Sequence, residues 1–195
     1  MQKVLHSITV LISFQHVHHT VAIEGNTLNL VQTRSLLETK LAIGGKSIQE
    51  HNEVLGLDAA LKYINQTLVD RPHGHIMLKD ILEIHRRVIG FVDPDEAGIF
   101  RQTQVYIGGH VPPPPSNLDV LMGHFLSWLN NPNTLMMDPV RMAGLAHYKL
   151  AYIHPFTDGN GRTSRFVIFH SVLEQIKKKV FTQTKDYHSM KPHTP

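Results

Sequence analysis

The chain of 195 residues contains no cysteine, which removes disulfide bonds from any account of its stability and leaves its cellular compartment undecided. Only 18% of the residues are charged, and the formal net charge of +3 is too small to argue for a nucleic-acid partner. The hydrophobic content of 42% is ordinary for a globular protein. Length and composition therefore predict one domain with a single core.

The chain also has no hydrophobic run long enough to cross a membrane. Residues 4–12 are apolar, but the stretch is too short and too interrupted to span a bilayer. As a signal peptide it is weak, because Lys3 is its only positive charge and residues 13–15 offer no small-x-small cleavage site. We expect a buried strand or the edge of a helix there, and no membrane contact by this chain.

Fifteen histidines are an unusual number, and three of them cluster at His16, His18 and His19. Metal binding by this cluster remains open, but no cysteine and no helix-spaced partner supports it. We expect a solvated polar face.

Apolar residues recur at intervals of three and four along most of the chain, which predicts a mainly α protein. A first helix is expected over residues 31–43, broken by Gly44 and Gly45. Ser47 to Glu50 has the pattern of a capping box, and Asp138-Pro139 has that of an N-cap followed by proline. Three further helical faces are formed by Val54, Leu57, Leu61, Ile64 and Leu68, by Ile81, Ile84, His85 and Val88, and by Leu118, Leu121, Met122, Phe125 and Leu129.

Residues 100–109 break the helical pattern. They are rich in strand formers, and Gly108-Gly109 stops the run, which predicts a β-hairpin arm. Taken alone, the pattern is equally that of a plain surface hairpin. Residues 112–115 are all proline and form a stiff connector.

The most informative segment is 154–165, His-Pro-Phe-Thr-Asp-Gly-Asn-Gly-Arg-Thr-Ser-Arg. Gly159 and Gly161 allow successive N–H groups to point at one spot, and the apolar run that follows predicts a helix whose N-terminus faces it. Arg162 and Arg165 share one helical face and can each fork onto phosphate oxygens. The segment is therefore typical of an anion-binding loop.

Two further residues of the loop add chemistry. Asp158 is suited to holding Mg2+ against phosphates. The helix that starts at Pro139 should run through Leu150 and deliver His154 beside the loop, with a pKa suited to accepting a proton from a hydroxyl. The segment predicts a phosphate-transfer site.

This segment resembles the Fic family signature His-x-Phe-x-Asp/Glu-Gly-Asn-Gly-Arg-x-x-Arg and matches it at every fixed position. The resemblance implies a Fic-fold helical bundle with a β-hairpin flap (about 100–110), and an enzyme that uses ATP with Mg2+ or Mn2+. It implies His154 as the catalytic base and Asp158 as the metal ligand. The implied nucleotide-binding residues are Glu24, Ile107, Gly108, Gly109, His110, Asp158, Gly159, Asn160, Gly161, Arg162, Thr163, Ser164 and Arg165.

Residues 20–26, Thr-Val-Ala-Ile-Glu-Gly-Asn, resemble the inhibitory motif of autoinhibited Fic proteins. Taken alone they are equally an ordinary helix start. Beside the Fic loop, a carboxylate at Glu24 would form a bidentate pair with Arg165 and occupy the guanidinium that should hold the γ-phosphate of ATP.

Residues from about 20 to 165 resemble the catalytic domain of metazoan FICD-type protein adenylyltransferases, including residues 83–87 and 93–98. We therefore expect a Fic domain at 20–180, after a divergent segment 1–19 and before a polar tail 181–195. The resemblance implies residence in the endoplasmic reticulum without the membrane anchor, an Hsp70 chaperone of the lumen as the target bound through the flap, and a homodimer contact at Ile48. The alternative for Ile48 is packing under its own helix. Asn65 heads an N-glycosylation sequon.

Two functions follow from these patterns. The first is an adenylyltransferase that moves AMP to a Ser, Thr or Tyr hydroxyl, is autoinhibited by Glu24, and also removes AMP. The second is a truncated, catalytically deficient interaction protein. It is kept open because residues after Arg165 depart from the family, whose later helices wall the adenine pocket.

Overall fold

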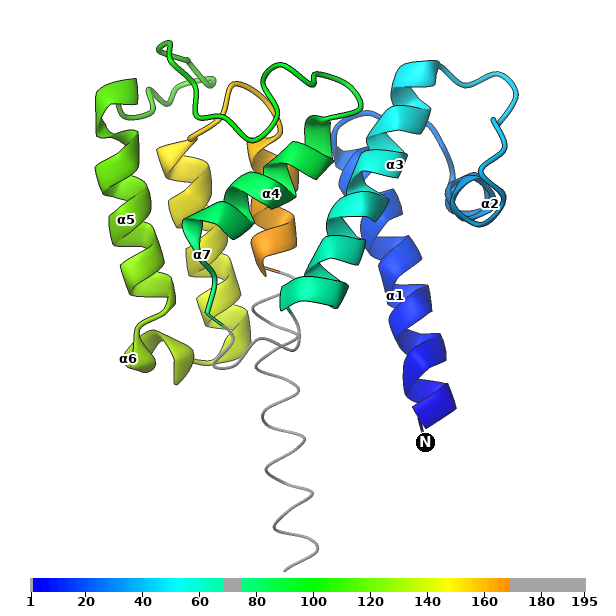
Figure 1. Ribbon diagram of the computed structural model, residues 1–195, viewed down its shortest axis with the longest axis horizontal. Helices are drawn as coiled ribbons and strands as arrows, with labels where there is room; N and C mark the ends of the chain where they lie inside the picture. Colours follow the sequence, from blue (N-terminus) through cyan, green and yellow to red (C-terminus); the bar gives the residue numbers. More distant parts are fainter. Residues whose placement is uncertain (1, 69–74, 169–195) are drawn as a thin grey trace, which may run out of the picture.

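The computed structural model describes residues 2–68 and 75–168, and it is mainly helical, as the sequence predicts (Figure 1). The predicted polar tail 181–195 and the end of the helix expected after Arg165 lie outside the described residues. The elements are α1 (Gln2–Ile23), α2 (Leu30–Thr39), α3 (Ile48–Tyr63), the π-helical turn η1 (Ile64–Leu68), α4 (Leu78–Ile89), the 3-10 turn η3 (Pro115–Asn117), α5 (Leu118–Leu129), α6 (Pro132–Leu135), α7 (Pro139–Ile153) and an unlabelled helix, 160–168.

The N-terminal segment is part of one long helix. Helix α1 runs without a break across the predicted boundary at residue 19, so the strand expected as one alternative for residues 4–12 is not formed. Within the part of the chain that is described, no helix combines the length and the apolar character needed to cross a bilayer. The His16 ring packs edge-on against Phe166 at 4.8 Å, and burial lowers its pKa to about 4. The expectation that the histidine cluster is a solvated face is therefore wrong for His16.

Helix α2 is shorter than the sequence predicts, because it ends at Thr39 rather than near Ile43. Lys40 adopts a left-handed conformation (φ 61°) and its N–H donates to the Leu36 carbonyl, which closes the last turn. The N–H of Ile43 instead donates to His51 Nε2 of α3 at 2.8 Å. This side-chain acceptor replaces the helical one, so the chain turns away from the helix axis before Gly44.

The predicted caps are confirmed. In α3 the Ser47 hydroxyl accepts from the Glu50 N–H at 3.1 Å, and the Glu50 carboxylate accepts from the Ser47 N–H at 2.8 Å. In α7 Asp138 caps the helix and Pro139 occupies its first turn. Helix α7 therefore starts and ends where the sequence predicts, with His154 at its C-terminus.

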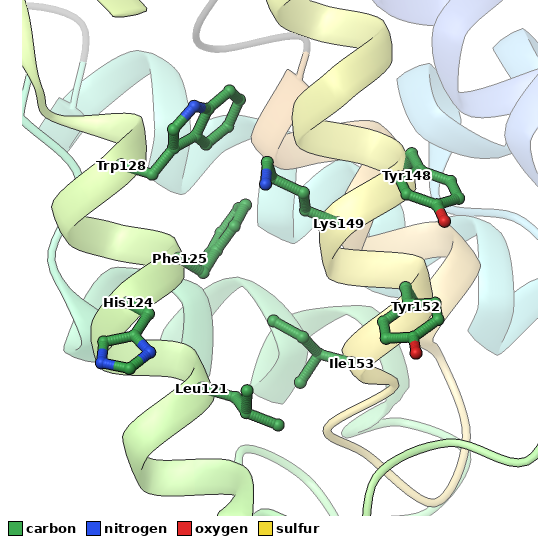
Figure 2. Close-up of a pocket in the computed structure, with 8 residues that line it drawn as sticks. All are labelled: Leu121, His124, Phe125, Trp128, Tyr148, Lys149, Tyr152 and Ile153. Atoms are coloured by element: carbon green, nitrogen blue, oxygen red, sulfur yellow. The ribbon is translucent and has the colours of Figure 1, made fainter.

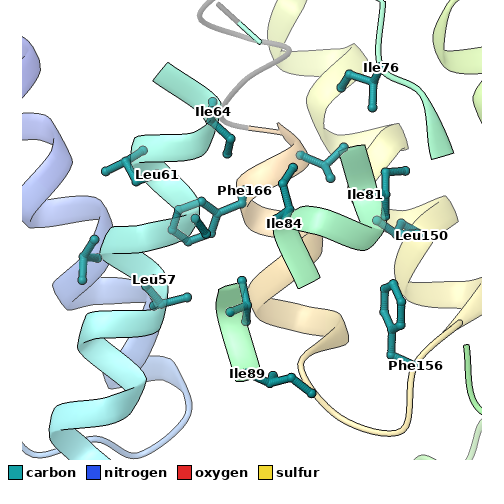
Figure 3. Packing of buried hydrophobic residues seen from close by; sticks show 14 of the residues in the cluster. Leu57, Leu61, Ile64, Ile76, Ile81, Ile84, Ile89, Leu150, Phe156 and Phe166 are labelled. Atoms are coloured by element: carbon teal, nitrogen blue, oxygen red, sulfur yellow. The ribbon is translucent and has the colours of Figure 1, made fainter. Parts of the chain in front are cut away.

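The core lies where α3, α4, α7 and helix 160–168 meet (Figure 3). Helices α3 and α4 approach so closely that a Cβ on Gly56 would lie 2.7 Å from the Arg87 carbonyl oxygen and 2.8 Å from that of Val88. The predicted apolar faces all turn inward. Their buried members include Val54, Leu57, Leu61, Ile64, Ile81, Ile84, Val88, Leu118, Met122, Phe125 and Leu129.

The expected β-hairpin is not formed as strands. Along residues 100–110, which are all described, the pairing is a single bridge between Ile107 and His110 around a Gly108-Gly109 turn. The returning arm enters Pro112 to Pro115, which carry no N–H to donate to a ladder. The Gln104 side chain donates to the Pro112 carbonyl at 2.8 Å in place of a main-chain bond. The sequence predicts a flap at about 100–110. In the structure the two arms begin and end at Thr103 and Pro113, whose carbonyls both accept from Arg101, so from here on the word flap means residues 103–113.

The bundle brings the ends of several helices to one side. Figure 1 shows the C-terminal ends of α1 and α7, the start of helix 160–168 and the flap at the same end of the molecule. The residues predicted to carry chemistry lie on these ends. The fold therefore gathers segments from residue 20 to residue 165.

We expect Gly56→Ala to lower the free energy of unfolding by about 1–3 kcal/mol, because the added Cβ forces α3 and α4 apart. Gly144→Ala in α7 is the matched control: its Cβ would meet nothing within 4 Å. That substitution should be neutral or stabilise by about 0.5–1 kcal/mol, since alanine favours a helix. Urea unfolding of both variants measures the difference, and equal stabilities would contradict the close α3–α4 approach.

Candidate active site

The loop 154–159 connects α7 to helix 160–168 and is fixed at both ends. His154 ends α7 in a left-handed conformation (φ 50°), and its N–H donates to the Leu150 carbonyl at 3.0 Å. At the other end the Asn160 side chain accepts from the Phe156 N–H at 2.9 Å and donates to the Phe156 carbonyl at 2.8 Å. These bonds close the loop on itself and hold its backbone in one shape.

His85 of α4 supports the loop from below. Its Nδ1 accepts from the Gly98 N–H at 2.9 Å, so its Nε2 carries the proton and donates to the Asp158 carbonyl at 2.9 Å. The ring stacks on Phe156 with centroids 3.6 Å apart and planes within 5°. Burial lowers the pKa of His85 to about 4, so the imidazole stays neutral and keeps both bonds.

Gly159 at the end of the loop and Gly161 in the first turn of the next helix have different roles. Gly159 adopts φ +74°, and a Cβ there would lie 2.6 Å from Ile89 Cγ2 of α4. Gly161 instead makes room above the loop, because its Cβ would meet Arg165 Nη1 at 3.1 Å and Glu24 Oε1 at 3.3 Å. One glycine lets the loop lie against α4, and the other lets an ion pair lie against the loop.

Helix 160–168 presents its N-terminus to this site, as the sequence predicts. Its first N–H groups, at residues 160–162, precede any intrahelical acceptor, whereas the Thr163 N–H already donates to the Gly159 carbonyl at 2.8 Å. The side chains of Thr163 and Ser164 are fully buried. The Ser164 hydroxyl lies 2.9 Å from the Gly161 carbonyl and 3.0 Å from His147 Nδ1. The predicted phosphate contacts at these two positions stay a prediction, because both side chains are buried and the Thr163 N–H already has an acceptor.

Asp158 and Arg162 form an ion pair at the start of the helix. The Arg162 guanidinium is buried and donates to Asp158 Oδ2 at 2.6 Å, while Asp158 Oδ1 accepts from the Gly159 N–H at 2.6 Å. Burial alone would raise the pKa of the Asp158 carboxyl, but Arg162 and the Gly159 N–H outweigh it, so the pKa is lowered. The carboxylate is therefore ionised and its side chain is 71% exposed, as a metal ligand requires.

Residues 2–68 and 75–168 contain no group of three His, Asp or Glu side chains arranged to hold a metal ion. A single carboxylate still fits Mg2+ that is carried in by a nucleotide, because this ion takes one or two carboxylates together with phosphate oxygens. Asp158 is the residue that would hold it.

Glu24 lies against Arg165, as the sequence predicts, but one guanidinium nitrogen contacts one carboxylate oxygen, so the expected bidentate pair is not formed. The Arg165 guanidinium donates to Glu24 Oε1 and also to the Thr20 carbonyl at 3.3 Å. The side chains of Arg165 and Glu24 are 18% and 37% exposed, so the pair is partly shielded from water. The Glu24 carboxylate therefore pairs with Arg165, one of the two arginines that the sequence predicts to bind phosphate.

The imidazole of His154 is oriented by α7. Its Nδ1 lies 3.3 Å from the Ala151 carbonyl, an acceptor, so Nε2 is the nitrogen left to take a proton. Burial lowers the pKa of His154, and the charges of Arg101 and His110 lower it further, which favours the neutral base. The flap lies next to it, since His110 Nε2 donates to the Tyr152 carbonyl at 3.2 Å.

A pocket of about 330 Å³ lies between α5 and α7, beside this site (Figure 2). It is largely apolar, and the Lys149 ammonium lies 5.0 Å from the centre of the Trp128 ring. No residue of the 154–165 loop lines it, so the candidate active site is separate from it. Its lining is Leu121, His124, Phe125, Trp128, Tyr148, Lys149, Tyr152 and Ile153.

Two predicted residues lie away from the site. Ile48 begins α3 and is 80% exposed, so the expected alternative that it packs under its own helix is wrong. Asn65 is half-buried in the π-helical turn η1, and its glycosylation stays a prediction.

The adenine half of the site, which the sequence left open, would involve residues after 168 and lies outside the described part of the chain.

Sequence reasoning missed three supports of the site. It assigned His85 to a helix face only, and it gave no role to Glu96, which accepts from the Thr157 hydroxyl at 2.9 Å. It also missed Arg101, which is 1% exposed and donates to the His154 carbonyl at 2.7 Å. No local pattern marks any of the three, because their partners within the loop 154–159 are between 53 and 73 residues away in sequence.

Comparison with known proteins agrees with these observations. The sequence model of the Fic/DOC family matches residues 75–171. The chain is 64% identical over 154 residues to the protein adenylyltransferase Fic of Aedes aegypti, and 61% identical over 155 residues to that of Drosophila ananassae. These matches cover 79% and 80% of the chain but only 31% of each relative, so the chain spans about a third of their length.

Solved structures give the same result. Fic-1 from C. elegans superposes with a TM-score of 0.78 at 50% identity, covering 83% of this chain and 48% of that one. A Fic-domain signaling protein from Bacteroides thetaiotaomicron has a TM-score of 0.77 at 26% identity, covering 90% of this chain and 67% of that one. The helical bundle described above is therefore shared with Fic proteins.

Proposed function

Since the chain belongs to the Fic/DOC family, we propose that it transfers AMP from ATP to a Ser, Thr or Tyr hydroxyl of a target protein. The observation that carries the proposal is the arrangement of the 154–165 loop. It combines an oriented imidazole, an ionised carboxylate, free helix N–H groups and two arginines at one end of the bundle.

The reaction follows from these groups. His154 Nε2 takes the proton of the target hydroxyl, and the oxygen attacks the α-phosphorus of ATP in line with the leaving group. The bond between the α-phosphorus and the oxygen that bridges to the β-phosphate breaks, so pyrophosphate leaves and AMP stays on the target. The N–H groups at residues 160–162 would stabilise the charge that develops on the phosphate oxygens, and Arg162 would contribute through its pair with Asp158. Bound Mg2+ on Asp158 would neutralise part of this charge.

Glu24 acts in this proposal as an inhibitor of the site. Its contact with Arg165 removes a guanidinium from phosphate binding and places a negative charge where the γ-phosphate would lie. ATP then binds without its productive pose. We propose that the same carboxylate holds a water for the hydrolysis of AMP from a modified target, a reaction in which His154 protonates the departing hydroxyl.

The target, the location and the assembly are further parts of the proposal. In this proposal the flap, which contacts α7 through His110 and the Tyr152 carbonyl, offers its main chain to an extended target segment. We take an Hsp70 chaperone of the endoplasmic reticulum as the target, on the basis of the resemblance to FICD-type enzymes. Homodimerisation at Ile48 is supported by the exposure of this apolar side chain at the start of α3.

His154→Ala is expected to lower AMP transfer by at least ~10²-fold, because no other described group replaces its Nε2 as the base. The assay follows labelled AMP on target protein in a Glu24→Gly background, where inhibition does not mask the rate. His124→Ala, an exposed histidine of α5, is the control and should keep the parent rate. Transfer at the parent rate by a folded His154→Ala protein would rule out the mechanism.

Glu24→Gly should raise productive ATP binding and auto-modification, because it frees Arg165, and should reduce hydrolytic removal of AMP. The matched control is Glu38→Gly, which breaks a surface pair with Arg34 and leaves the loop untouched. Isothermal titration with ATP and labelled auto-modification measure both effects. If Glu24→Gly and Glu38→Gly behave alike, residues 20–26 are only the end of α1, which the structure shows in place of the helix start that the sequence left open.

Ile48→Asp is expected to give monomers without unfolding the domain, because the new charge would meet its own copy across a twofold axis. Val140→Asp places the same charge at an equally exposed apolar position near a helix start, in α7, and should leave assembly unchanged. Sedimentation at matched concentrations distinguishes them. A parent chain that is monomeric at micromolar concentration removes the basis for this part of the proposal.

A further inference from the structure

Arg101 is a buried cation that no carboxylate neutralises among the described residues. Its side chain is 1% exposed, and all of its hydrogen bonds go to backbone carbonyls. Taking a charged guanidinium out of water costs several kcal/mol unless its donors are satisfied. Arg101 meets this condition with charge-assisted bonds from Nε and from both terminal nitrogens.

The partners of Arg101 belong to three separate places in the chain. Nε donates to the His154 carbonyl at 2.7 Å, Nη1 to the Thr103 carbonyl at 3.0 Å and Nη2 to the Pro113 carbonyl at 2.5 Å. The main-chain N–H of Arg101 donates to the Pro155 carbonyl at 3.0 Å. One residue therefore holds the outgoing base of the flap, its returning base and the loop that starts at His154.

The flap has little else to fix it. Its own pairing is the Ile107–His110 bridge, and the Gln104 side chain ties the two arms once more through the Pro112 carbonyl. After the Gly108-Gly109 turn, His110 Nε2 donates to the Tyr152 carbonyl, and the centroids of the His110 and Tyr152 rings lie 4.7 Å apart. The planar guanidinium fixes the directions of its donors, so the two bases and His154 keep one mutual geometry.

From this geometry we propose that Arg101 is a positioning residue, which fixes the flap relative to His154 so that a target segment bound by the flap presents its hydroxyl to the imidazole. The inference deepens the AMP-transfer function proposed above and rests on it. A misplacement of about 1 Å between a hydroxyl and its base costs roughly 10²-fold in rate, so a single anchor for both sides affects catalysis directly.

The charge of Arg101 has a second effect on the same imidazole. Burial is the main cause of the lowered pKa of His154, and the Arg101 cation lowers it further. Removing the cation should therefore raise the pKa of His154, whereas a substitution that only loosens the fold should bring it toward the ordinary value together with those of other buried histidines.

Three variants in the Glu24→Gly background test the inference. Arg101→Met removes both the charge and the fork, Arg101→Lys keeps the charge but loses the fork, and Arg141→Met removes an exposed arginine of α7 as the control. We expect Arg101→Met to lower kcat for AMP transfer by roughly 10- to 100-fold and to raise KM for the target. Arg101→Lys should also raise KM, because one ammonium cannot bond all three carbonyls in their fixed directions.

NMR titration of the imidazoles supplies a readout that does not need activity. Arg101→Met should raise the titration midpoint of His154 and leave that of His85 unchanged, while Arg101→Lys should keep the His154 midpoint near that of the parent. Amide exchange along the flap should be faster in both variants and unchanged in Arg141→Met.

Parent values of kcat, KM and flap exchange in Arg101→Met would overturn the inference. If Arg101→Met does not fold, Arg101→Lys decides: parent KM and parent flap exchange in that variant would also overturn it. If the Glu24→Gly protein that serves as the parent transfers no AMP, the proposed function is wrong instead. The titration and exchange results would still report whether Arg101 joins the flap to His154.

Discussion

The site depends on one neutral imidazole at the junction of three segments. His85 accepts from the Gly98 N–H and donates to the Asp158 carbonyl. Its two ring nitrogens therefore hold the segment before the flap on one side of the ring and the loop 154–159 on the other. Its stacking on Phe156 fills the space beneath the loop. Because both bonds require a single protonation state, burial that keeps the ring neutral also keeps the loop in place.

The remaining contacts build outward from this support. With the loop held, helix 160–168 begins at a fixed point, and its N-terminus, Asp158 and Arg162 acquire a defined relation to His154. The end of α1 then meets the loop through Glu24 and Arg165. The proposed chemistry and the proposed inhibition therefore depend on the same few residues, although these residues come from opposite ends of the sequence.

Sequence reasoning predicted the parts of this arrangement that are encoded locally. The helix faces, the caps at Ser47 and Asp138, and the loop between α7 and the next helix follow from spacing and residue type, and the structure confirms them. The pairing of Glu24 with Arg165, 141 residues apart, came from resemblance to a family and not from spacing.

The failures share a physical cause. Helix α2 ended early because Lys40 adopts a left-handed conformation, and beyond it the Ile43 N–H donates to His51 Nε2, an acceptor that no local pattern reveals. The hairpin forms no ladder of main-chain hydrogen bonds, because the prolines of the returning arm have no N–H. The prediction of strands was based on the residues of the outgoing arm alone. Arg101 and His85 act through carbonyls that any residue could supply, so neither their burial nor their partners leave a mark in the sequence.

Because Gly161 has no side chain, it limits how the proposed inhibition by Glu24 could be lost through mutation. The space above this residue is shared by the guanidinium that would hold a phosphate and by the carboxylate that blocks it. A bulkier residue at position 161 would crowd both partners, so such a substitution cannot remove the proposed inhibition without also disturbing Arg165. If the proposed inhibition holds, activating variants in a genetic selection would accumulate in α1 and the segment after it, and substitutions of Gly161 would yield only loss of function.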